Sequence, residues 1–123
     1  MTMKEQVPKQ PMTMMQALEA YQRGDQATFD AWYFEQQRAA DQDPSGVRRF
    51  EVSVELARIQ FAAGDLEKAR ETISGVNMAL QEELVELDRL DSSAYERPDK
   101  EEYRAKLKSL LQNVVLLRNE LRR

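Results

Sequence analysis

Hydrophobic residues recur three and four positions apart in five stretches of the chain, and this spacing predicts five α-helices. The stretches are Met14 to about Arg23, Gln26 to about Ala40, Val47 to Ala63, Leu66 to about Asp91, and the residues that follow Asp99 up to the C-terminus. Only four Gly and four Pro occur among the 123 residues, which argues against a β-sandwich with many tight turns. We therefore expect an all-α protein.

The predicted helices are separated by residues that end one helix and begin the next. Gly24-Asp25 and Gly64-Asp65 each join a glycine, which suits the left-handed position after a helix, to an aspartate that can cap the following helix. Thr13 and Gln16 have the spacing of a capping box. Four turn-forming residues, Asp43-Pro44-Ser45-Gly46, predict a loop.

The third predicted helix is apolar on two sides. One stripe contains Phe50, Val54 and Ala57, and a second stripe, rotated around the axis, contains Leu56 and Ile59. A helix with two apolar sides is usually packed between neighbours. We expect this helix to be the central one.

The last two predicted helices have the features of an antiparallel hairpin. The fifth helix carries a heptad seam with spacings of four and three, formed by Tyr103, Leu107, Leu110, Val114, Leu117 and Leu121. Leu111, Val115 and Leu116 widen this seam, so more than one neighbour can pack against it. The fourth helix is acidic and the fifth basic, and a hairpin would bring Lys106 and Lys108 towards the 82–88 stretch of the fourth. The regularity of the seam also predicts self-association, as a dimer through both helices.

The expected organisation is a single helical domain preceded by a short arm. Residues 1–10 are polar and without periodicity, which predicts a flexible N-terminal arm. Residues 11–63 form a compact body of helical hairpins, and residues 64–123 form the long hairpin. No stretch approaches the roughly 18–20 apolar residues of a membrane helix, and no signal peptide is recognisable, so the prediction is a soluble, cytoplasmic protein.

Composition removes several kinds of chemistry. The chain contains no Cys and no His, so thiol nucleophiles, imidazole bases and the usual zinc sites are excluded. Glu82, Glu83 and Glu86 are one turn apart on a helix, but a di-iron site of the bundle type also requires histidine. No phosphate-binding glycine loop is present. We expect no catalytic residue, no metal and no cofactor.

Aromatic residues are concentrated in the first third of the chain, where they can either form part of the core or contact a partner protein. They are Tyr21, Phe29, Trp32, Tyr33 and Phe34. Three consecutive aromatic residues span more than half the circumference of a helix, so at least one of them must face away from the core. Because Trp and Tyr are enriched at binding hot spots, this cluster is the candidate partner-binding site.

The stretch Leu56-Ala57, Gly64-Asp65-Leu66, Ala69 and Ile73 resembles a tetratricopeptide (TPR) motif. In that family small residues let two helices approach each other, and large apolar residues fill the space between them. Gln60 stands where the family has an aromatic residue, and the closing proline is missing near Gln81. A generic helical hairpin is the alternative. The resemblance implies a scaffold that binds peptides or proteins without catalysis.

The function predicted from the sequence is a non-catalytic protein–protein interaction module, such as an adaptor, an assembly factor or a chaperone-like scaffold. It would bind a partner protein through a helical groove or an exposed apolar seam. The alternative is a nucleic-acid-associated regulator that uses Arg48, Arg49 and the basic C-terminal helix. The net charge of −4 disfavours that alternative, because no overall positive field attracts nucleic acid.

Overall fold

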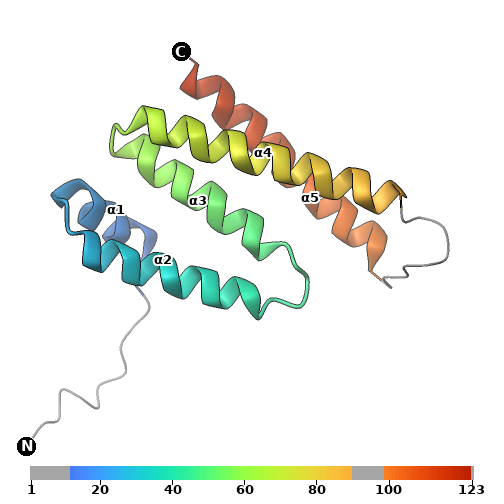
Figure 1. Cartoon of the computed structure of the whole chain (residues 1–123), viewed down its shortest axis with the longest axis horizontal. Coiled ribbons are helices and arrows are strands. Elements are labelled where there is room, and N and C mark those ends of the chain that lie inside the picture. Colours follow the sequence, from blue (N-terminus) through green and yellow to red (C-terminus); the bar gives the residue numbers. More distant parts are fainter. Residues whose placement is uncertain (1–11, 90–98, 123) are drawn as a thin grey trace, which may run out of the picture.

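The computed structural model describes residues 12–89 and 99–122, and in this part of the chain it is an all-α protein without strands (Figure 1). The helices are α1 (Met14–Arg23), α2 (Gln26–Asp41), α3 (Arg48–Ala62), α4 (Leu66–Arg89) and α5 (Lys100–Leu121). All five predicted helices are therefore confirmed. The predicted N-terminal arm and the connection between the last two helices lie outside the described residues.

The helix ends form as the sequence predicts. At the start of α1, the Thr13 backbone N–H donates to Gln16 Oε1 over 2.9 Å, and the Gln16 N–H donates to Thr13 Oγ1 over 3.1 Å. Gly24 has a φ of 76° and donates its N–H back to the last turn of α1. The Asp25 carboxylate then accepts from the Thr28 N–H at the start of α2. These local bonds fix where the first two helices begin and end.

α3 lies at the centre of the fold, as its two apolar sides predict. In Figure 1, α2, α3 and α4 follow one another across the view, with α1 beside the first pair and α5 behind α4. α3 packs against each of the other four helices. Its side chains divide between two apolar clusters, because Phe50, Val54 and Ala57 face α4 and α5, whereas Ile59 faces α1 and α2.

The smaller of the two clusters joins α1, α2 and α3, and we call it the N-terminal cluster. Its buried members are Ala17, Ala20, Phe29, Trp32 and Ile59. Two alanines with no exposed surface allow α1 to approach its neighbours closely. Met12 also packs against the cluster, whereas Met14 and Met15 are exposed. Burial of the two large aromatic side chains supplies most of the apolar area here.

The larger cluster joins α3, α4 and α5. On α4 its buried members include Ile73, Val76 and Leu80, and on α5 they are Tyr103, Leu107, Val114, Leu117 and Leu121. α4 runs through Ser74-Gly75 without a break, so the predicted single long helix is confirmed up to Arg89.

The heptad seam of α5 faces its own chain and not a second copy. Five of its six residues are buried, and the sixth, Leu110, is half-buried against the same cluster. The prediction that this seam mediates self-association is therefore wrong, because α4 already covers it. The regular heptad spacing reflects an intramolecular partner.

Polar contacts show that α4 and α5 are antiparallel. Near one end Arg70 of α4 donates to the Leu121 carbonyl, and near the other Arg104 of α5 pairs with Asp88 over 3.0 Å. The predicted partners differ from those observed. Lys106 pairs with Glu102 on its own helix, and Glu83 pairs with Arg49 of α3.

A hydrogen bond between the end of α1 and the Gly64-Asp65 turn ties the two halves of the molecule together. The Tyr21 hydroxyl, at the end of α1, donates to Asp65 Oδ2 over 2.5 Å at the turn before α4. Partial burial, together with the bond to this carboxylate and its negative charge, raises the pKa of Tyr21 to about 12.

This pKa predicts a loss of stability at high pH that depends on Tyr21. The unfolded chain releases the phenol proton near pH 10, whereas the folded chain retains it until about pH 12. The stabilisation is complete below pH 10 and is lost as pH rises from 10 to 12. Chemical denaturation at several pH values should show a steeper decline for the native chain than for Tyr21→Phe. Parallel declines would contradict the prediction.

Candidate functional site

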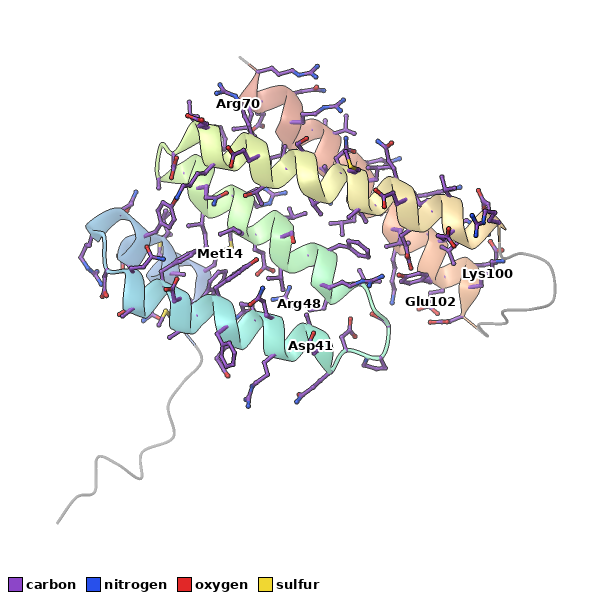
Figure 2. All side chains as sticks on the ribbon, in the orientation of Figure 1. Met14, Asp41, Arg48, Arg70, Lys100 and Glu102 are labelled. Atoms are coloured by element: carbon purple, nitrogen blue, oxygen red, sulfur yellow. The ribbon has the colours of Figure 1, made fainter. Side chains whose placement is uncertain are left out.

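A groove of about 650 Å³ lies between α5 and the residues where α2 ends and α3 begins, 39–51, which we call the α2–α3 corner. One side is lined by Ala39, Asp43, Ser45, Val47, Arg48 and Glu51, and the other by Lys106, Ser109, Leu110 and Asn113. Figure 2 labels Asp41 and Arg48 at this corner. The volume is within the range of about 300–1,000 Å³ that is typical of ligand pockets.

The turn before α3 is held by the carboxylate of Asp43. Asp43 accepts hydrogen bonds from the Ser45 hydroxyl over 2.7 Å and from the Arg48 backbone N–H over 2.9 Å. The bond from the Ser45 hydroxyl and then that from the Arg48 N–H lower the pKa of Asp43. Val47 stands at the N-cap and has no side-chain cap, so Asp43 replaces it in satisfying the first turn of α3. This wall of the groove is therefore preorganised.

Arg48 is held by partners within its own chain. Its guanidinium donates to both carboxylate oxygens of Glu55, over 2.6 and 3.2 Å, and to Gln36 Oε1 of α2 over 2.6 Å. The hydrogen bonds to Glu55 raise the pKa of Arg48. A bidentate pair of this kind fixes the position of the guanidinium. Arg48 therefore braces α2 against α3.

Arg49 is held in a similar way, on the side of α3 that faces the hairpin. It pairs with Glu83 over 3.3 Å, donates to the Tyr103 hydroxyl, and stacks over the Phe50 ring at 4.5 Å. The two arginines that the nucleic-acid alternative requires are thus both used in packing helices together.

The opposite wall of the groove is a polar side of α5. Ser109 and Asn113 are one helical turn apart and exposed, and Leu110 between them adds apolar surface. Val47 and Ala39 add apolar surface on the corner side. Sequence analysis missed Ser109 and Asn113, because exposed polar residues on a helix carry no periodic signal.

The aromatic cluster is divided between core and surface. The ring of Phe29 is edge-on to Tyr21 at 5.0 Å and close to Trp32 at 5.8 Å, between ring centroids. Phe29 and Trp32 are 5% and 3% exposed, so the prediction that they contact a partner is corrected: they fill the N-terminal cluster. Tyr21 and Tyr33 are half-buried against it. Phe34 is 64% exposed and is the aromatic residue that faces away from the core.

The surface of the α4–α5 pair away from α3 also exposes large apolar side chains. Met78 and Val85 of α4 and Leu116 of α5 are each more than 60% exposed. Leu111 and Val115 of α5 are half-exposed and line one depression together with Leu116. The sequence indicated the α5 residues, but Met78 and Val85 fall outside the main stripe of α4.

The carboxylates that could suggest a metal site are dispersed. Glu83 is bound to Arg49 and Tyr103, and Glu86 pairs with Arg89. Among residues 12–89 and 99–122, no three Asp or Glu side chains gather closely enough to hold a metal ion. Within the same residues, none of the helices is long and apolar enough to cross a membrane.

Comparison with known proteins gives no relative: no family model, no curated protein and no solved structure matches this chain. The resemblance to the tetratricopeptide motif therefore stays a prediction.

Proposed function

We propose that this chain is a non-catalytic protein-interaction module that binds an extended segment of another protein in the groove between the α2–α3 corner and α5. The observation that carries the proposal is the groove itself, with one preorganised wall and one wall of exposed polar side chains. The role would be that of an adaptor, an assembly factor or a chaperone-like scaffold.

The lining of the groove suits a peptide backbone. Asn113 and Ser109 offer donors and acceptors one turn apart, and an extended peptide presents both kinds of group along its length. Val47 and Leu110 provide apolar contacts for its side chains. Glu51 and Lys106 place charges of both signs at the rim, which selects the direction and sequence of the segment.

The nucleic-acid alternative has less support. Arg48 and Arg49 both form ion pairs within the chain, so phosphate would have to compete with Glu55 and Glu83. Arg118 and Arg122 remain at the end of α5, where cations also interact favourably with the helix dipole.

The proposal includes self-association as a dimer. Since α4 covers the heptad seam of α5, the surface for it is the exposed apolar side of the α4–α5 pair, which includes Met78, Val85 and Leu116.

A variant that fills the groove tests the peptide site. Ser109→Trp should abolish binding of a partner captured by the native chain, because the indole would occupy the space between the walls. The measurement is affinity capture with mass spectrometry, followed by titration of the purified partner. Gln37→Trp, on an exposed position of α2 outside the lining, is the matched control and should bind normally.

Two outcomes would count against the groove. Equal binding by Ser109→Trp and the native chain would show that the partner binds elsewhere. A photoreactive residue at position 113 that forms no cross-link to the captured partner would do the same.

A further inference from the structure

We propose that two copies of this chain associate through the outer face of the α4–α5 pair, so that α4 of each copy lies along α5 of the other in a closed antiparallel four-helix bundle. This inference rests on the proposed self-association and specifies its surface, symmetry and charge pairs. It is independent of the peptide groove, which lies on another side of α5.

The outer face is defined by where the neighbouring helices touch α4 and α5. On α4, Thr72 and Glu83 reach α3, whereas Arg70 and Asp88 reach α5. At 3.6 residues per turn, a rotation around α4 passes first the side that faces α3 and then the side that faces α5. Met78 and Val85 come next in the same direction. Both are exposed because no described helix covers that side.

The outer side of α5 is located in the same way, from its contacts with α3 and α4. Tyr103 reaches Arg49 of α3, and Arg104 reaches Asp88 of α4. Beyond the contact with α4 come Lys108, Val115 and Leu116. The exposed apolar residues of both helices therefore lie on one side of the pair, the side away from α3.

Charge differs between the two halves of this face over most of its length. Glu67, Glu71 and Glu82 are exposed along α4, with Arg89 at its end, and Lys108 and Arg122 are exposed along α5, with Glu101 at its start. The side chains of Glu71, Glu82 and Lys108 form no ion pair or hydrogen bond with other residues in the described part of the chain. Arg118 is half-buried, and its Nε is buried without a hydrogen-bond partner among these residues. The fold thus leaves the side chains of Glu71, Glu82 and Lys108 available for a partner.

This separation of charge selects one symmetry. A two-fold axis perpendicular to the helices would place α4 on α4, acidic on acidic, and α5 on α5. A two-fold axis parallel to the helices places α4 of each copy on α5 of the other, acidic on basic. Like charges across an interface are costly, so the parallel axis is the favourable arrangement.

The antiparallel register of the hairpin then specifies the pairs. Arg70 lies level with Leu121, and Asp88 lies level with Arg104 (Figure 2 labels Arg70 at one end of the pair and Lys100 at the other). Rotation about a two-fold axis parallel to the helices does not move a residue along the helix direction, so residues that are level within one copy are also level between the two copies. Glu82 consequently faces Lys108 of the second copy, and Glu71 faces the Arg118–Arg122 turn of the second copy.

The face is large enough for a stable dimer. At about 1.5 Å per residue the shorter helix, α5, with 22 residues, is about 33 Å long. Two helices with axes about 10 Å apart present a face about 20 Å wide, so two such faces bury about 1,300 Å² in total. Stable interfaces bury about 1,200–2,000 Å².

Cross-linking of single-cysteine variants tests which helices face each other. The chain contains no cysteine, so each introduced thiol is unique. Co-expressed Glu82→Cys and Lys108→Cys chains, treated with a short bismaleimide, should form a covalent heterodimer, and neither variant should cross-link when expressed alone. A covalent dimer of Glu82→Cys alone, or no heterodimer in the mixture, would overturn the proposed arrangement.

Charge reversal tests the same pair by affinity. Glu82→Lys creates two repulsive pairs per dimer and should raise the dimer dissociation constant about tenfold. Glu82→Lys combined with Lys108→Glu should restore it, and Glu19→Lys, on exposed α1, should leave it unchanged. Failure of the double variant to restore affinity would contradict the pairing.

Light scattering over a dilution series separates the possible failures. A monomer at all accessible concentrations would overturn self-association together with this inference, while the peptide groove would still stand or fall by the Ser109→Trp result. A dimer with the wrong cross-links would overturn only the arrangement.

Discussion

Phe29→Ala is expected to lower the free energy of unfolding by about 3–5 kcal/mol, whereas Phe34→Ala should change it by less than about 0.5 kcal/mol. The two residues are on the same helix and have the same side chain. Phe29 is 5% exposed, at the centre of the N-terminal cluster, where it contacts the rings of Tyr21, Trp32 and Tyr33. Its removal leaves a cavity that α1 and α3 cannot fill, while Phe34 leaves only solvent-exposed surface.

Urea denaturation followed by circular dichroism measures both values. The expected loss for Phe29→Ala is a large share of the 5–15 kcal/mol that is typical of small domains. Similar values for the two variants would mean that the N-terminal cluster does not hold α1 and α2 in place.

Leu117→Asp is expected to unfold the α4–α5 pair, whereas Leu116→Asp should leave the fold intact and dissociate the proposed dimer. The two leucines are adjacent in sequence but point to different surroundings. Leu117 is buried against α4, so a carboxylate there loses apolar contacts and enters the core without a partner, at a cost of more than about 4 kcal/mol. Leu116 is 63% exposed on the outer face, and a carboxylate there would lie in the proposed dimer interface.

Two measurements separate these effects. Circular dichroism should show loss of helix only for Leu117→Asp, and light scattering should show a folded monomer for Leu116→Asp. A folded, monomeric Leu117→Asp chain would restore the heptad seam as the self-association surface. A fully dimeric Leu116→Asp chain would exclude this residue from it.

The fold was largely predictable from the sequence because its signals are local. Gly24 and Gly64 adopt positive φ angles of 76° and 85°, and these are the two glycines expected to end helices. The two apolar sides of α3 predicted its central position for the same reason, since each side requires a covering neighbour. Helix ends and buried faces are properties of a few neighbouring residues.

The surfaces were less predictable, because periodicity shows that a face is covered but not by what. The α5 seam has the same heptad pattern whether α4 or a second chain covers it, and only the structure shows that α4 does. The partners of Lys106 and Arg49 depend on side-chain reach across helices whose rotation is set by packing. The groove combines residues from α2, the α2–α3 corner and α5, which no local pattern links.

The position of α3 between two clusters has a consequence for how the chain folds as it leaves the ribosome. Every buried member of the N-terminal cluster lies between Ala17 and Ile59, so that cluster can close before α4 emerges from the ribosome. The other cluster extends to Leu121 and has to wait for almost the whole chain. Domains emerge and fold from the N-terminus onwards. We expect nascent α3 to be anchored first on one side, and its uncovered side to act as the template on which α4 and then α5 assemble.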